Sequence, residues 1–239
     1  MTCAVVARCP LTGHFGIAVA SYSIAIGRHC DGALRANTGA AIALGSPDPR
    51  SNYLAINLLA QGHTAAQALN QLLANDSDAE YRQIAIVDRE TAVARSGSML
   101  RPWSGHHVGA GYVAFGDMLA GKAVVDALAS AFEAHPQAAL DERLVEALAA
   151  ARAAGGFTGG RGRLPERSAA LVVWGSRPYN EIDLRVDLHD DAIADLQRIY
   201  VDYKPSIAYY EERALSPRNA VPAMEFVEKL EAGRRKEAR

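Results

Sequence analysis

Residues 2–21 read Thr-Cys-Ala-Val-Val-Ala-Arg-Cys-Pro-Leu-Thr-Gly-His-Phe-Gly-Ile-Ala-Val-Ala-Ser, and this segment carries the strongest signal for the fold. Its two apolar runs are separated by Pro10-Leu-Thr-Gly13, which combines residues typical of a turn. The pattern predicts two antiparallel strands at the start of the chain. The rest of the fold must therefore be built around a sheet that begins with the first residues.

Further strands and helices follow in groups. The expected elements are a strand region over 32–44 broken at Asn37-Thr-Gly39, helices over 51–61 and 65–73 with Thr64 as a helix N-cap, a hairpin of strands over 82–88 and 91–95, a strand over 112–115, helices marked by Val124 to Phe132 and Leu140 to Leu148, strands over 168–174 and 182–188, and a helix over 191–203. Strands linked as hairpins disfavour a βαβ Rossmann pattern. The order predicts an α/β fold of the α+β type, a four-layer αββα sandwich of two antiparallel sheets.

The length of 239 residues and a hydrophobic content of 49% suffice for one large domain. We expect this domain to span residues 1–204. Residues 205–239 form a C-terminal helical extension, with a helix over 216–239, rather than an independent domain. The extension carries an apolar set that must be buried somewhere, so we expect a homodimer. That set is Ile207, Tyr209, Tyr210, Val221, Met224, Phe226, Val227 and Leu230.

Charge and cysteine content exclude several classes of protein. The formal net charge of -2 provides no basic face for DNA or RNA, so nucleic acid is not an expected partner. The N-terminal residues lack the pattern of a signal peptide, and no apolar run is long enough to cross a membrane. We therefore expect a cytoplasmic protein without a membrane partner.

The three cysteines, Cys3, Cys9 and Cys30, are odd in number and have no CxxC spacing. They predict reduced thiols rather than a disulfide framework. A metal site that combined Cys9 and Cys30 with His14 and His29 would have no recurring ligand spacing. Neither a metal nor a cofactor is expected.

Several segments together resemble the bacterial family catalogued as domain of unknown function 1028, which is grouped with the N-terminal-nucleophile (Ntn) hydrolases. The matching segments span roughly residues 1–200. They are Met1-Thr2, Ala4-Val-Val-Ala-Arg8, Thr12-Gly13, Gly16-Ile-Ala-Val-Ala-Ser21, Gln83-Ile-Ala-Ile-Val-Asp88, Trp103-Ser-Gly-His106, Phe115-Gly-Asp-Met-Leu-Ala-Gly121, Arg167-Ser-Ala-Ala-Leu171 and Leu184-Arg-Val-Asp187. Their order and spacing carry the resemblance, because no one segment is specific.

The resemblance implies a catalytic role for Thr2. In Ntn hydrolases the first residue of the mature chain supplies a nucleophilic side chain and an α-amine that acts as the base. Thr2 is small enough for an aminopeptidase to remove Met1 before it. We also expect its side chain to contribute little to packing at the chain terminus. Without removal of Met1, Thr2 is an ordinary strand residue.

By the same resemblance, Ser21 at the end of the second strand and Arg35 on the third would flank the nucleophile. Otherwise Ser21 is a turn former and Arg35 a surface charge. Asp117 either orients a substrate amine or, as carboxylates do more often, caps the helix that begins at Lys122. Trp103 and the loop residue His106 suit a substrate-pocket wall, although a loop histidine more often only forms hydrogen bonds.

Two departures from the family pattern fall where a substrate could bind. Asp117 replaces the asparagine that usually follows Gly116, and the longer Phe157-Thr-Gly-Gly-Arg-Gly-Arg163 replaces a compact loop. The Gly-rich segment lacks the following Lys-Ser/Thr of a phosphate-binding loop, so a flexible lid or disordered connection is the better interpretation.

The leading hypothesis is an amidohydrolase that cleaves a small amide or peptide-like bond, with Thr2 as nucleophile. The alternative is a non-catalytic ligand-binding protein on the same fold. A third possibility makes Cys3 the reactive group, since thiols are better nucleophiles.

Overall fold

The computed structural model describes residues 1–30, 32–160 and 162–237. It divides into two compact units, Met1–Gln197 and Arg198–Arg239. None of the helices within the described ranges is both long and apolar enough to cross a membrane.

The first unit contains a six-stranded antiparallel sheet in the order β12-β11-β2-β1-β8-β7. Its strands are β1 (Thr2–Arg8), β2 (Phe15–Ser21), β7 (Gly105–Gly109), β8 (Tyr112–Asp117), β11 (Ser168–Trp174) and β12 (Asn180–Val186). The N-terminal strand β1 thus lies inside the sheet, paired on one side with β2 and on the other with β8.

A second antiparallel sheet has the order β3-β4-β5-β6. Its strands are β3 (Ala33–Arg35), β4 (Gly39–Gly45), β5 (Arg82–Val87) and β6 (Ala92–Ser96). The strands β3 to β6 pack over β2, β1, β8 and β7 of the larger sheet. The buried core between the sheets includes Ala4, Val6, Ile42 and Phe115.

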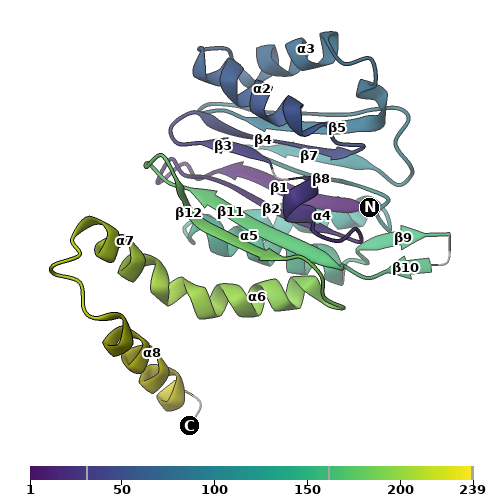
Figure 1. The fold of residues 1–239 in the computed structure, drawn as a ribbon. Coiled ribbons are helices and arrows are strands. Elements are labelled where there is room, and N and C mark those ends of the chain that lie inside the picture. Colours follow the sequence, from purple (N-terminus) through teal and green to yellow (C-terminus); the bar gives the residue numbers. More distant parts are fainter. Residues whose placement is uncertain (31, 161, 238–239) are drawn as a thin grey trace. The chain divides into compact units, whose positions relative to one another are not determined.

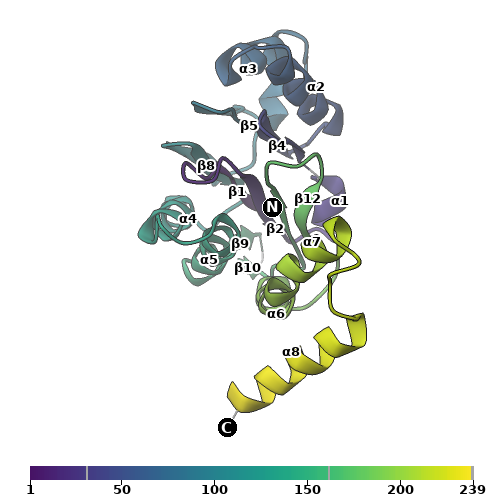
Figure 2. The ribbon, with the colours of Figure 1, turned by 90° about the vertical axis from the view of Figure 1, so that its left-hand side faces the viewer.

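Helix pairs cover the two outer faces, as Figures 1 and 2 show. On the four-stranded sheet lie α2 (Pro49–Ala60) and α3 (Ala65–Ala74), and on the six-stranded sheet lie α4 (Lys122–Ala134) and α5 (Leu140–Ala153). The predicted four-layer αββα sandwich of two antiparallel sheets is therefore confirmed.

Local sequence explains where the second helix begins. The Thr64 side chain accepts a hydrogen bond from the Gln67 backbone N–H at 3.2 Å, and the Gln67 side chain accepts one from the Thr64 N–H at 2.9 Å. This reciprocal capping box satisfies donors that would have no partner at a helix start. The predicted N-cap is confirmed.

Three elements differ from the sequence-based expectation. Residues 105–109 form strand β7 rather than a loop, so His106 lies on a strand. The Gly-rich segment contains a short hairpin of β9 (Phe157–Gly159) and β10 (Gly162–Leu164) instead of a flexible lid; residue 161 of that segment lies outside the described residues. A one-turn helix, α1 (Ile26–His29), follows β2. Strand β7 and the hairpin are rich in glycine. Because glycine has no side chain, these segments lack the alternation of apolar and polar side chains that predicts a strand.

Helix α6 (Ala192–Tyr203) crosses the boundary between the two units. The second unit continues with a short 3-10 turn (Lys204–Ser206), α7 (Ile207–Leu215) and α8 (Ala223–Glu237). The Tyr209 ring on α7 stacks on Phe226 of α8 with centroids 3.9 Å apart. The expected helix over 216–239 was too long: α8 begins at Ala223, directly after Pro222, because proline is tolerated at a helix start but not inside one.

Candidate functional site

The candidate site is built around Thr2 at the first position of β1. Strand alternation places Thr2 on the same face as Ala4 and Val6, which belong to the core between the sheets. Cross-strand pairing puts Ser21 directly opposite on β2 and Asp117 directly opposite on β8. Three residues that are far apart in sequence thus meet in one row across three strands.

The side chains of this row contact each other. Thr2 Oγ1 lies 3.1 Å from Ser21 Oγ, and the Thr2 backbone N–H donates to Asp117 Oδ1 at 3.0 Å. The Met1 ammonium forms an ion pair with Asp117 Oδ2 at 2.9 Å. Thr2 is only 6% exposed, which contradicts the expectation that its side chain has few packing neighbours.

The Met1 carbonyl oxygen is held by two donors. Ser21 Oγ donates to it at 2.7 Å and the Tyr22 backbone N–H at 3.2 Å. A serine hydroxyl has one hydrogen, so the Thr2 hydroxyl must be the donor in its contact with Ser21 Oγ. Ser21 Oγ also accepts from the Ser23 backbone N–H at 3.1 Å. The orientation of the Thr2 hydroxyl is therefore fixed by Ser21.

Ser168 extends the row by one strand. It pairs with Ser21 across β2 and β11, is fully buried, and donates to the Ser23 carbonyl oxygen at 2.6 Å. Its Oγ accepts from the Ile26 backbone N–H at 3.0 Å, which fastens the start of α1 to the sheet. Sequence reasoning used Ser168 as the start of a strand and as part of a family match, but not as a site residue. Its place in the alternation of β11, in phase with core residue Ala170, is the signal that could have identified it.

Asp117 does not cap a helix, so that interpretation was wrong. The N-cap of α4 is Gly121, and no side chain caps it. The carboxylate of Asp117 instead faces the backbone of residues 1 and 2, because β8 ends beside the start of β1.

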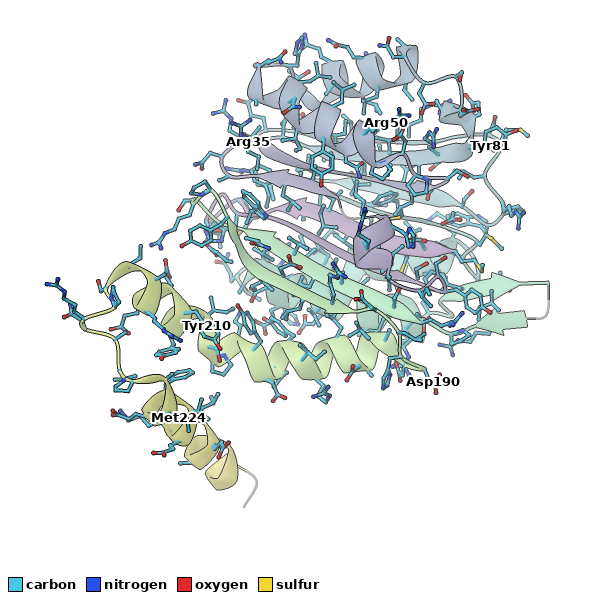
Figure 3. All side chains as sticks on the ribbon, viewed as in Figure 1. Arg35, Arg50, Tyr81, Asp190, Tyr210 and Met224 are labelled. Carbon is cyan, nitrogen blue, oxygen red and sulfur yellow. The ribbon has the colours of Figure 1, made fainter. Side chains whose placement is uncertain are left out.

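Arg35 is not brought to Thr2. It is exposed at the end of β3, which belongs to the other sheet. In the shared view of Figures 1 and 3, Arg35 lies at the left end of the four-stranded sheet, whereas the N-terminus lies on the right. The spacing of residues along the chain could not predict the separation of Arg35 from Thr2, because it does not show at which end of the sandwich a strand ends.

Trp103 and His106 lie at the same end of the sheet as Asp117. The Trp103 carbonyl oxygen accepts from the Leu119 backbone N–H at 2.9 Å, and Gly105 pairs with Gly116. A Cβ added to Gly105 would lie 2.5 Å from the Trp103 ring, so the ring covers this glycine closely. Trp103 thereby packs against the strand next to the one that carries Asp117.

His106 takes part in a second polar cluster, formed across the two sheets. Its Nδ1 lies 2.9 Å from Ser96 Oγ, and the Gln83 side-chain amide donates to Ser96 Oγ at 2.9 Å and to the Gly105 carbonyl at 3.1 Å. Partial desolvation lowers the pKa of His106, so its neutral form is favoured. Sequence reasoning did not connect Gln83 and Ser96 with this histidine.

Cys3 is poorly suited to act as a nucleophile. It is 1% exposed, and strand alternation turns it toward the helices rather than toward the row. Burial raises the pKa of its thiol, and the nearby Glu166 and Asp117 carboxylates raise it further. The thiolate needed for attack is therefore disfavoured.

The described residues contain no group of three or more His, Cys, Asp or Glu side chains placed to hold a metal ion. None of the described cysteines, Cys3, Cys9 and Cys30, forms a disulfide, and all three are buried.

Comparisons with known proteins connect this arrangement to a family. A family model described as a family of unknown function, DUF1028, matches residues 2–196. A crystal structure of a protein from Silicibacter pomeroyi, described by the same family model, is 29% identical, with 85% of this chain and 89% of that chain covered and a TM-score of 0.74. No curated protein matches the sequence.

More distant solved structures are also similar. Thiobacillus denitrificans BPH, in complex with epoxomicin, is 14% identical, with 74% of this chain and 100% of that chain covered and a TM-score of 0.40. Anbu, an ancestral beta-subunit, from Yersinia bercovieri is 12% identical, with 87% and 96% covered and a TM-score of 0.39. Similarity at this level carries no information about activity.

Proposed function

The chain belongs to the DUF1028 family of unknown function, and we propose that it is an N-terminal-nucleophile amidohydrolase that cleaves a small amide or peptide-like bond. Thr2 is the nucleophile after removal of Met1, and its own α-amine is the base. The observation that carries this proposal is the position of Thr2, buried in the row with Ser21 and Asp117 on either side.

Removal of Met1 changes the row in a way that suits acyl transfer. The Thr2 nitrogen becomes a free amine beside Asp117 Oδ1, on the same residue as the attacking hydroxyl. Ser21 Oγ and the Tyr22 N–H lose the Met1 carbonyl oxygen as their common acceptor. These two converging donors are then free to bind the carbonyl oxygen of a substrate, where negative charge develops during attack.

Trp103 and His106 are the proposed substrate-binding wall, and Asp117 positions the amine. Arg35 has no part in this proposal, because it lies at the other end of the sandwich. The three cysteines, none of which forms a disulfide among the described residues, support a reducing, cytoplasmic location.

The alternative is a ligand-binding protein without catalysis, and one observation favours it. With Met1 in place, its ammonium pairs with Asp117 and its carbonyl oxygen accepts from Ser21 and Tyr22, so the unprocessed terminus is held in the row. An amide nitrogen on Thr2 cannot act as the base, so a protein that retains Met1 cannot use the proposed mechanism.

Intact-protein mass spectrometry separates the two functions. Loss of Met1 supports the hydrolase, and complete retention contradicts it. The parent protein and the Thr2→Ala and Thr2→Ser variants are then assayed for hydrolysis of a panel of acyl-p-nitroanilide substrates. Because Ala lacks the nucleophile, Thr2→Ala should lose several orders of magnitude in activity, whereas Thr2→Ser should remain active. Full turnover by a processed Thr2→Ala protein would exclude Thr2 as the nucleophile.

We also propose that the chain forms a homodimer through its C-terminal unit. Tyr210, Leu215, Met224 and Val227 are exposed apolar side chains there, and Figure 3 labels Tyr210 and Met224. Burial of such side chains against a second copy removes apolar surface from water. Light scattering should show a dimer for the full chain and a monomer for a Met224→Glu, Val227→Glu variant. A dimer that persists in the variant would contradict this interface.

A further inference from the structure

A cavity lies in the layer between the sheets, outside the row at Thr2. The six-stranded sheet is wider than the four-stranded one, whose strands β3 to β6 pack over β2, β1, β8 and β7. On β11 this face is covered by the short helix α1 instead. The replacement of a strand by one turn of helix leaves a cavity of about 310 Å³.

The floor of the cavity is apolar. It consists of two cross-strand pairs of β2 and β11, Ile17 with Val172 and Val19 with Ala170. Tyr53 from α2 and Trp174 from β11 add aromatic side chains to the lining. The volume is at the lower end of the range for small-molecule sites, so it suits a compact ligand with an apolar body.

Charged side chains complete the described lining. They are Arg28 on α1 and Arg185 and Asp183 on β12. Arg185 is engaged by Asp187, with Nη2 and Oδ2 3.0 Å apart, and Asp183 accepts from Asn180 at 2.7 Å. Arg28 is exposed, and its guanidinium group makes no hydrogen bond or ion pair with the part of the chain that the structure describes.

We propose that this cavity binds a small monocarboxylate with an aromatic or branched apolar body. The apolar body lies on the floor beside Trp174, and the carboxylate binds Arg28, whose planar group is matched to carboxylate oxygens. Because Arg185 is already paired with Asp187, Arg28 is the described lining cation left to bind an anion. The Asp183 carboxylate disfavours a doubly charged group such as a phosphate monoester.

The cavity is separate from the Thr2 row but shares a wall with it. Val19 and Ala170 of the floor are each two residues along their strands from Ser21 and Ser168. Helix α1 lies between: its first amide is held by Ser168 Oγ, while Gly27 and Arg28 line the cavity. The proposal therefore does not depend on hydrolysis at Thr2.

The two tryptophans of the chain provide a direct test, because each indole N–H gives its own NMR signal. Phenylacetate is the probe, and phenylacetamide is the uncharged match. Phenylacetate should shift the Trp174 signal, identified with Trp174→Phe, in a saturable way and leave the Trp103 signal unchanged. Phenylacetamide should bind about tenfold more weakly, the effect of one lost charged contact.

Variants locate the binding site. Arg28→Gln should weaken phenylacetate binding about tenfold, and Val172→Phe should abolish it by filling the floor. Arg50→Gln is the matched control, since Arg50 is an exposed arginine paired with Asp48 outside the cavity lining, and it should bind like the parent protein. A Trp174 signal that does not move, or equal affinity for the acid and the amide, or an Arg28→Gln protein that binds normally, would overturn the proposal.

Discussion

The row at Thr2 and the cavity beside α1 occupy the same layer between the sheets but differ in how their polar groups are used. In the row, Thr2, Ser21 and Asp117 are buried, and their polar atoms already bind each other or the adjoining backbone. In the cavity, Arg28 and Asp183 are exposed above an apolar floor. In this fold the candidate reactive groups therefore lie in the row, and the cavity that could hold a ligand lies beside α1.

The largest expected difference concerns the two aspartates. Asp117→Ala leaves the N-terminal ammonium and the Thr2 nitrogen without their acceptor in a mostly buried place, so we expect a loss of about 2 to 3 kcal/mol in the free energy of unfolding. Asp183→Ala removes an exposed carboxylate and should cost about 0.5 kcal/mol or less. Urea unfolding of both variants measures this contrast, and equal losses would show that the row is not the more tightly organised region.

A smaller effect should test whether the two regions are linked. Ser168→Ala leaves the Ile26 N–H and the Ser23 carbonyl oxygen without their partner, and should cost about 1 to 2 kcal/mol. Because α1 also lines the cavity, the same variant should weaken phenylacetate binding. Ser23→Ala changes an exposed serine and serves as the control. Unchanged binding by a destabilised Ser168→Ala protein would show that α1 is held by its other contacts.

The smallest effect should be the response to acid, which comes from His106 in the second polar cluster with Ser96 and Gln83. Partial desolvation lowers the pKa of His106 below the usual 6.5, so as the pH falls through 6.5 the unfolded chain takes up a proton before the folded protein does. The contribution of His106 to stability is therefore complete above that pH and is lost below it. Unfolding midpoints measured between neutral and mildly acidic pH should fall less for His106→Gln than for the parent, and parallel curves would contradict this assignment.

The sequence predicted the sandwich because its core strands alternate or run apolar without interruption, as in residues 2–21. The resemblance to the family, rather than the strand pattern, predicted that Ser21 flanks Thr2, and the pairing of β1 with β2 places the two residues opposite each other. The sequence could not predict the contact between Asp117 and residues 1 and 2, which depends on a pairing between strands more than a hundred residues apart. The position of Arg35 was missed for the same reason, because it depends on how one sheet is stacked on the other.

The location of β1 inside the larger sheet has a consequence for biosynthesis. The pairings of the four-stranded sheet all fall within residues 33–96, so that sheet can form early as the ribosome releases the chain. Strand β1 can join β2 at once, but its other edge stays open until residues 112–117 have emerged to form β8. Over that interval Asp117 is not yet available to hold the N-terminus, and the Met1–Thr2 bond is open to an aminopeptidase. If Met1 is removed as proposed, the order of synthesis favours its removal before β8 pairs with β1.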